Sequence, residues 1–329
     1  MSTTLLLSGA DVRALLPAAD CIQAVEAAFR RAAQTPVPVG VLETQLERGG
    51  FHLKTAALPG KRHYFAAKLN GNFPDNPRLG LPTIQGVVAL CDGGDGRLLA
   101  LLDSAELTRL RTGAATAVAA KYLARPESAT VLLFGCGAQA AAQLECLAQV
   151  LPLRRLHAHD RVAERAAALA RWAADHLGLS AAAVSGAEAL QRAGESDVIV
   201  TCTPAREWFL ARAAVPPGAF VAGVGADAPG KQELEPALLA ASKVVADVLE
   251  QCCRMGELRH AILTGALTRE DVHAELAEVV SGSRPGRESP QEITLFDSTG
   301  TALEDVAAAA LAYERASGCD RGVRWSRND

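Results

Sequence analysis

A glycine-rich turn at residues 135–140 has the residue types needed to hold the phosphates of a nucleotide. The apolar stretch 131–134 leads into Gly135-x-Gly137-x-x-Ala140, and an apolar, alanine-rich segment follows. In a strand, turn and helix, Gly135 permits the tight turn, Gly137 lets the backbone approach a pyrophosphate, and Ala140 allows the helix to pack on the strand. The free N–H groups at the helix start then face the anion. The pattern predicts a dinucleotide site, although an ordinary turn between strand and helix has the same spacing.

Asp160 strengthens this prediction. It ends the next apolar stretch, residues 156–160, and lies 25 residues after Gly135. A carboxylate there can accept hydrogen bonds from the adenosine ribose hydroxyls and repel a 2′-phosphate, so we expect NAD rather than NADP. Arg161 beside it could soften that preference and leaves NADP open. A surface aspartate without a ligand is the alternative.

Three cations lie within apolar segments that are predicted to be regular structure. Lys54 and Lys68 interrupt apolar strands, and Arg111 lies in an apolar helix where Thr112-Gly113-Ala114-Ala115 follows it. The small residues would let a ligand approach Arg111, whose guanidinium can bind a carboxylate through two hydrogen bonds. Solvated lysines and a solvated helix arginine remain the alternatives.

Further polar residues follow the predicted strands of the second half. Asp227 lies in the glycine-rich segment 223–231 and could act as a general acid or base beside a nicotinamide. Residues 201–204 end the preceding strand and should line the same crevice. Asp297-Ser298-Thr299-Gly300 precedes the last helix. Turn formation and helix capping are the alternative roles for Asp227 and Asp297.

The spacing of apolar residues predicts two domains of α/β class. Residues 1–125 should form an antiparallel α+β domain, which the last helix, within 301–329, joins; residues 126–300 should form a Rossmann-type parallel sheet. In the first domain we expect helices after Ser8 and Pro17, strands at 51–57, 64–69, 84–90 and 98–102, a hairpin turn at 92–96 and a helix from 103 or 104 to about 123. In the second we expect strands near 130–134, 154–159, 197–202, 219–224, 243–247 and 293–296, and helices near 138–150, 162–177, 233–241 and 268–281.

The composition excludes several classes of function. A net charge of −4 with scattered Lys and Arg gives no reason to expect nucleic acid or a membrane surface, and no apolar run approaches the roughly 18 residues of a membrane span. Residues 1–7 lack a signal-peptide pattern. The eight Cys are dispersed without C-x-x-C, which indicates reduced thiols in a cytoplasmic protein. The seven His show no metal-binding spacing, so we expect no metal.

Six stretches, in order and over nearly the whole chain, resemble the ornithine cyclodeaminase/mu-crystallin family. They are Gly80-Leu81-Pro82-Thr83, Leu110-Arg111-Thr112-Gly113-Ala114-Ala115, Tyr122-Leu123-Ala124-Arg125-Pro126, Gly135-Cys136-Gly137-Ala138-Gln139-Ala140, the run from Val224-Gly225-Ala226-Asp227 to Lys231-Gln232-Glu233-Leu234, and the run from Phe296-Asp297-Ser298-Thr299-Gly300 to Glu304-Asp305.

The resemblance implies a homodimer built through the N-terminal domain, which also binds substrate, and a Rossmann domain that binds NAD or NADP. Lys68 and Arg111 would bind the substrate carboxylate, Asp227 would be the catalytic acid or base with Lys68 beside it, and Thr299 would lie near the substrate. The cofactor contacts would fall on Thr83, Arg111, Thr112, Gly135, Gly137, Ala138, Gln139, Asp160, Arg161, Thr203, Val224, Gly225, Lys231 and Ser298.

One position departs from the family pattern. Cyclodeaminases of the family carry a further carboxylate-binding arginine near the first strands, and the alignment places Gly40 there. Lys54, where many members have an apolar residue, would replace the missing cation and join the substrate-binding residues. The presence of Asp227 favours chemistry on an amino acid.

The resemblance leaves three functions open. The first is an NAD-dependent cyclodeaminase that converts L-ornithine, or a close diamino acid, to a cyclic imino acid such as L-proline. It would release ammonia and would abstract and return a hydride at the α-carbon. The second is a ketimine (Δ1-pyrroline-2-carboxylate) reductase or an alanine-type dehydrogenase. The third is a non-catalytic nucleotide-binding protein. The side-chain specificity and the net redox balance stay open.

Overall fold

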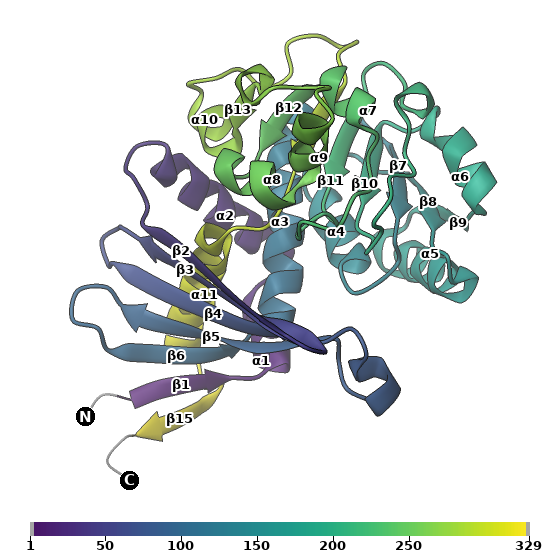
Figure 1. Ribbon diagram of the computed structural model, residues 1–329. Helices are drawn as coiled ribbons and strands as arrows, with labels where there is room; N and C mark the ends of the chain where they lie inside the picture. The colour runs from purple at the N-terminus through teal and green to yellow at the C-terminus, as the bar shows by residue number, and fades with distance from the viewer. Residues whose placement is uncertain (1–2, 327–329) are drawn as a thin grey trace. The chain divides into compact units, whose positions relative to one another are not determined.

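The computed structural model describes residues 3–326, and it divides into two compact units (Figure 1). We call Met1–Thr112 with Thr301–Asp329 the terminal unit, and Gly113–Gly300 the central unit. The predicted boundary lay after residue 125, whereas the division falls inside helix α3 (Ser104–Leu123). The second half of α3 belongs to the central unit because its small residues pack closely there. A Cβ on Gly113 would lie 2.5 Å from the carbonyl oxygen of Ala142.

The central unit is built on an eight-stranded parallel sheet in the order β13-β12-β14-β11-β10-β7-β8-β9. The strands are β7 (Thr130–Phe134), β8 (Arg155–His159), β9 (Ser180–Ala183), β10 (Val198–Thr201), β11 (Phe220–Gly223), β12 (Lys243–Ala246), β13 (Ala274–Glu275) and β14 (Thr294–Asp297). The buried runs of Val, Leu, Ile and Phe in β7, β10, β11, β12 and β14 are typical of strands covered on both faces. The strand order reverses at β7, so the sheet has the Rossmann-type α/β fold that the sequence predicts, with its switch point between β7 and β10.

Short helices connect the strands of the central unit. They are α4 (Ala140–Leu147), α5 (Ala163–Leu177), α6 (Gly186–Ala193), α7 (Pro236–Ala240), α8 (Leu249–Met255), α9 (Glu257–Leu263) and α10 (Leu276–Ser281), with 3-10 turns at Arg212–Ala214 and Arg269–Asp271. The prediction of a helix at 268–281 is wrong for the first half of that range. Thr268 and Asp271 form a reciprocal cap, but it closes only a 3-10 turn, and β13 follows before α10. The helix predicted at 233–241 begins later, at Pro236.

The terminal unit contains a seven-stranded sheet in the order β15-β1-β6-β5-β4-β3-β2. The strands are β1 (Thr3–Leu7), β2 (Val39–Leu46), β3 (Gly49–Leu58), β4 (Tyr64–Asn72), β5 (Ile84–Asp92), β6 (Leu98–Asp103) and β15 (Val323–Ser326). The sheet was predicted to be antiparallel, and it is except for the parallel pair of β1 and β6. In the chain, α1 (Gly9–Leu15) and α2 (Ala18–Ala32) separate β1 from β2, and β1 pairs with β6 rather than with β2.

The two faces of this sheet differ. Helix α11 (Ala302–Ser317) packs on one face, against β3, β4 and α2 (Figure 1). Tyr64 of β4 donates a hydrogen bond to Glu314 of α11 at 2.8 Å. Because directly paired residues of antiparallel strands point to the same face, the register places Lys54 and Lys68 on this side. The opposite face is apolar: Leu42, Leu53, Leu69 and Val87 form one row across β2 to β5.

No helix within residues 3–326 combines the length and the apolar character that crossing a lipid bilayer requires.

Candidate functional site

The glycine turn has the open geometry that a pyrophosphate needs. Gly135 adopts a φ of +93°, and a Cβ there would lie 2.7 Å from the carbonyl oxygen of Cys202, which follows β10. A side chain at Gly135 is therefore excluded both by the backbone conformation and by the neighbouring loop. A Cβ on Gly137 would meet no atom within 4 Å. The turn thus lies at the switch point between β7 and β10, with free space in front of its second glycine.

Asp160 follows β8 and holds the glycine turn in place. Its Oδ2 accepts a hydrogen bond from the backbone N–H of Cys136, and its Oδ1 accepts one from Val162, both at 2.8 Å. A carboxylate has about four acceptor positions, so lone pairs remain for two ribose hydroxyls. Arg161 is exposed beside it. This arrangement fits the prediction that Asp160 accepts hydrogen bonds from the adenosine ribose.

Several buried side-chain atoms of the central unit have no hydrogen-bond partner within residues 3–326, and two of them bear on the cofactor. Gln139 Oε1, just before α4, and Ser298 Oγ, just after β14, accept or donate no hydrogen bond within the described chain. Buried polar groups are normally paired, and each unpaired one costs about 1–3 kcal/mol. Both atoms belong to residues expected to contact the cofactor. A dinucleotide with its polar groups near these positions would satisfy them, so the residues present fit the cofactor.

Asp227 and Lys231 form an ion pair on the loop after β11. Lys231 Nζ lies 2.5 Å from Asp227 Oδ1, and half of the Asp227 side chain is exposed. These residues were expected to have separate roles, Asp227 in catalysis and Lys231 in cofactor binding. The structure brings them together and leaves the carboxylate accessible to a ligand.

Thr299 is held in place by hydrogen bonds with two neighbouring side chains. Asp247 accepts hydrogen bonds from both the backbone N–H and the hydroxyl of Thr299, at 2.7 and 3.0 Å. Gln251 Nε2 donates to the same hydroxyl at 2.7 Å. The contact between Thr299 and substrate stays a prediction, and these partners give the residue a second, structural role.

The cations of the terminal unit meet at two carboxylates of α11. Lys68 Nζ lies 2.8 Å from Asp305 Oδ2, and Arg111 Nε lies 2.8 Å from Asp305 Oδ1. Arg111 Nη1 also lies 2.6 Å from Glu304 Oε2. All four side chains are almost fully buried. Asp305 therefore bridges Lys68 and Arg111, as expected for two cations that serve one anion.

The electrostatics of this cluster follow from its burial. Loss of hydration, reinforced by the charge of Arg111, lowers the pKa of Lys68 to about 8. Burial alone would raise the pKa of Asp305, yet the charges of Lys68 and Arg111 hold it below its ordinary value. Asp305 is thus ionised at neutral pH, whereas Lys68 titrates just above it.

Lys54 lies on the same face, directly across from Lys68, and its charge also disfavours protonated Lys68. The register of β2 does not fit the expectation that Lys54 replaces a cation from position 40, however. Gly40 pairs with Thr55 and so points to the opposite face, while Val41 is the residue across from Lys54. A side chain at position 40 could not reach these cations, so Lys54 does not replace one from Gly40.

The remaining predicted residues are divided between the units. Thr83, half-buried in the loop before β5, and Thr112, buried in α3, belong to the terminal unit. Ala138, Thr203, Val224 and Gly225 belong to the central unit, at the carboxyl ends of β7, β10 and β11. No role was predicted from the sequence for Asp305, Glu304 or Glu233. Two consecutive acids within an alanine-rich, buried helix were the available signal for Asp305 and Glu304.

The pKa of Lys68 predicts a pH dependence for anion binding. Below about pH 8 the protonated amine attracts a carboxylate, and above it the neutral amine does not. We expect the affinity for pyruvate, a carboxylate without an amine, to be constant from pH 6 to 7 and to fall as the pH rises above 8. Titration by calorimetry would measure this. Lys68→Arg should keep the affinity constant because its charge persists, and a constant affinity in the native protein would contradict the assignment.

Comparisons with known proteins agree with this architecture. The model of the ornithine cyclodeaminase/mu-crystallin family matches residues 2–320. An alanine dehydrogenase of Archaeoglobus fulgidus is 40% identical over 317 residues, which cover 95% of each chain.

Three solved structures share the whole fold. An archaeal alanine dehydrogenase dimer with bound NAD has a TM-score of 0.93 at 38% identity and covers 99% of both chains. The Δ1-pyrroline-2-carboxylate reductase of Thermococcus litoralis, in complex with NADH and L-proline, has a TM-score of 0.93 at 31% identity and covers 97% of this chain and 99% of its own. A lysine cyclodeaminase that recognises L-lysine, L-ornithine and L-2,4-diaminobutyric acid has a TM-score of 0.84 at 34% identity, with coverage of 98% and 95%.

The match of the family model spans nearly the whole chain, and the alanine dehydrogenase of 40% identity is covered over 95% of its length. The chain therefore belongs to the ornithine cyclodeaminase/mu-crystallin family.

Proposed function

We propose that this protein is an NAD-dependent oxidoreductase that interconverts a small α-amino or cyclic imino acid and the corresponding imine or keto acid. The observation that carries the proposal is the buried pair of Lys68 and Arg111 bridged by Asp305. Two such cations bind a carboxylate, the group that amino and imino acids share. The similar alanine dehydrogenase and pyrroline-2-carboxylate reductase support this substrate class.

The central unit would hold NAD through the residues described above. When bound, NAD accepts a hydride from the substrate, and its reduced form returns one. The glycine turn would hold the pyrophosphate and Asp160 the adenosine ribose, while Gln139 and Ser298 supply polar contacts. The NAD and NADH of the similar structures support this cofactor.

The side chains have distinct tasks in the proposed reaction. Lys68 and Arg111 hold the carboxylate and thereby fix the α-carbon. Oxidation of the amino acid removes a hydride from that carbon and a proton from the nitrogen, and Asp227 accepts the proton. Water then replaces ammonia if the product is a keto acid. In the reductive direction Asp227 returns the proton to the nitrogen.

Cyclodeamination of a diamino acid is the second candidate. Asp227 favours it, because ring closure and loss of ammonia require a base that moves protons between two nitrogens. The similar lysine cyclodeaminase supports it as well. The residue at position 41 argues against it: Val41, rather than a cation, lies across from Lys54, so β2 offers no further positive charge to the carboxylate-binding face.

A panel of L-alanine, Δ1-pyrroline-2-carboxylate, L-ornithine and L-lysine tests the proposal. NADH absorbance and ammonia release would be followed together. A stoichiometric change in NADH with alanine or the cyclic imine supports the oxidoreductase. Ammonia and a cyclic product without a net change in NADH would replace it with the cyclodeaminase. Binding of NAD without turnover of any substrate would leave a non-catalytic nucleotide-binding protein.

The cofactor assignment predicts a result for Asp160. Asp160→Ala should weaken NAD binding by about 10- to 100-fold, since one charged hydrogen bond is worth about 1.5–3 kcal/mol, and should narrow the difference in affinity between NAD and NADP. Fluorescence titration with both cofactors measures this. Arg161→Ala is the control, and it should weaken NADP more than NAD. Tighter binding of NADP than of NAD to the native protein would refute the assignment.

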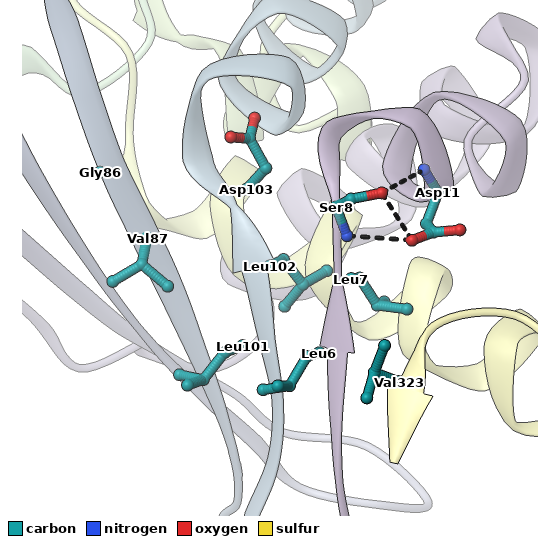
Figure 2. Close-up of a pocket in the computed structure, with 10 residues that line it drawn as sticks. All are labelled: Leu6, Leu7, Ser8, Asp11, Gly86, Val87, Leu101, Leu102, Asp103 and Val323. Atoms are coloured by element: carbon teal, nitrogen blue, oxygen red, sulfur yellow. Dashed lines mark hydrogen bonds between the residues drawn. The ribbon is translucent and has the colours of Figure 1, made fainter. Parts of the chain in front are cut away.

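We also propose that the apolar face of the terminal sheet forms a homodimer. Phe51, Phe65, Leu69, Val323 and Trp325 are exposed, although each carries a large apolar side chain. A surface hollow on this sheet is lined by further apolar residues, among them Leu6, Val87 and Leu101 (Figure 2). Contiguous apolar surface of this kind is typical of interfaces. The similar alanine dehydrogenase is described as a dimer, which supports a second copy as the partner.

Leu69→Glu tests the interface. It would place a charge near the centre of the apolar row, so light scattering should show a monomer where the native protein is a dimer. Leu263→Glu, at an exposed leucine of the central unit, should leave the dimer intact. A dimer that survives Leu69→Glu unchanged would place the interface elsewhere.

A further inference from the structure

Four carboxylates are buried together at the carboxyl ends of the central strands. They are Asp247 after β12, Asp297 at the end of β14, Glu257 at the start of α9, and Glu233 before α7. Each is at most 1% exposed. Within residues 3–326 none of them forms an ion pair with Lys, Arg or His. We call these four residues the carboxylate chain.

Each member of the carboxylate chain binds backbone N–H groups of another segment. Asp247 accepts from Thr299 and Gly300, both at 2.7 Å. Asp297 accepts from the first N–H groups of α9, including that of Leu258 at 2.9 Å. Glu257 in turn accepts from the backbone of Glu233 at 2.7 Å and from that of Leu234 at 3.2 Å.

Glu233 ends the chain by joining two loops. Its Oε1 accepts a hydrogen bond from the backbone N–H of Thr203 at 2.6 Å. Its Oε2 accepts from the N–H of Gly225 and from the hydroxyl of Thr201, both at 2.8 Å. The loop after β11 is fitted closely to it, because a Cβ on Gly225 would lie 2.4 Å from Oε2. One buried carboxylate thus fixes the ends of both β10 and β11.

The burial of these acids has an energetic cost. Burial raises the pKa of Glu233 and Glu257 and raises the pKa of Asp297 to about 7. Removing a carboxylate from water costs several kcal/mol unless hydrogen bonds compensate it. Acids with such perturbed pKa values gather at functional sites more often than elsewhere. Here the compensating donors are the loops expected to hold the cofactor.

We propose that Glu233 is a positioning residue for catalysis. It sets the distance between the Thr203 loop and the Gly225 loop, which carry expected cofactor contacts and lead to Asp227. The carboxylate chain ties this arrangement to the loop of Ser298 and Thr299. The inference rests on the proposed function for the identity of the cofactor and of Asp227, and its test can be separated from that function.

Glu233→Gln is the direct test. Glutamine keeps the shape, but one of its two terminal atoms becomes an NH₂ group that faces the N–H of Thr203 or of Gly225. One loop therefore loses its anchor. We expect the NAD dissociation constant to rise about tenfold and kcat at saturation to fall by up to about 10²-fold, the effect of a displacement near 1 Å, with the amino acid KM unchanged.

Asp197→Asn is the matched control. Asp197 also accepts from two backbone N–H groups, those of Ala129 and Thr130, but it does so at the amino end of β10. The Asp197→Asn variant should have a lower melting temperature than the native protein and an unchanged NAD dissociation constant. A merely structural Glu233 would behave in the same way.

The outcomes are distinct. NAD affinity and kcat of Glu233→Gln within twofold of the native values, in a folded protein, overturn the proposal. If that variant does not fold, Thr201→Val tests the proposal in its place, because this substitution removes only the hydroxyl that donates to Glu233 Oε2. A rise in its NAD dissociation constant supports the proposal, and an unchanged constant overturns it. Native protein that binds NAD but turns over no amino acid would instead refute the proposed reaction, and NAD titration would still test Glu233.

Discussion

Lys68→Met is expected to raise the KM for the amino or imino acid by about 10- to 100-fold, because one buried, charged hydrogen bond to the carboxylate is worth about 1.5–3 kcal/mol. Methionine fills the space of the lysine stem. Asp305 keeps its contact with Arg111 at 2.8 Å, so the substitution leaves no buried carboxylate without a cation. Steady-state kinetics at saturating NAD would measure the KM.

Three further measurements show whether the effect belongs to the carboxylate. NAD affinity should not change, since Lys68 is not among the expected cofactor contacts. Lys61→Met, at an exposed lysine, should leave all constants unchanged. Arg111→Lys should also raise the KM, because an ammonium cannot bind two partners in the plane of a guanidinium. A folded Lys68→Met protein with a KM within twofold of the native value would remove Lys68 from the substrate site.

The fold of the central unit could be predicted because the sequence patterns that indicate its strands and helices are local. Each of the strands β7, β8, β10, β11 and β12 is a short apolar run followed by glycine, a polar turn or an alanine-rich helix, and alternation of this kind leaves few topologies. Strands without such runs were not predicted. β9 consists of Ser180–Ala183, and β13 has only two residues, Ala274 and Glu275. Their conformation depends on the strands beside them rather than on their own sequence.

The residues of the candidate site also divide into those that a local sequence pattern predicts and those that only the fold brings together. The glycine turn and Asp160 lie within one strand–helix–strand unit, so their spacing in the sequence is enough to predict them. Asp305 reaches Lys68 from 237 residues away, and no sequence pattern reports a pair at that separation. The position of Gly40 shows how sensitive strands are to register. A shift of one residue moves a side chain to the other face of the sheet, and only the pairing of β2 with β3 distinguishes Gly40 from Val41.

Asp227→Asn is expected to lower kcat by about 10²- to 10⁴-fold, the usual contribution of a general acid or base. In the proposed reaction the carboxylate accepts a proton from the nitrogen when the hydride leaves the α-carbon, and it returns that proton in the reductive direction. Asparagine has nearly the same shape but cannot accept the proton. Because Gly225 and Glu233 hold the loop through its backbone, the substitution should not move it. Stopped-flow absorbance of NADH would measure the chemical step.

The ion pair with Lys231 requires a control of its own. Lys231 Nζ lies 2.5 Å from Asp227, so Asp227→Asn also releases a cation that is expected to contact NAD. Lys231→Met separates the two effects, because it should weaken NAD while keeping most of kcat at saturating NAD. Asp75→Asn, at another exposed aspartate paired with an arginine, should change neither constant. If Asp227→Asn keeps more than about a tenth of the native kcat, it falls outside the range of a general base. The Asp227 carboxylate would then serve to position Lys231, and the proton would have to come from another group or from water.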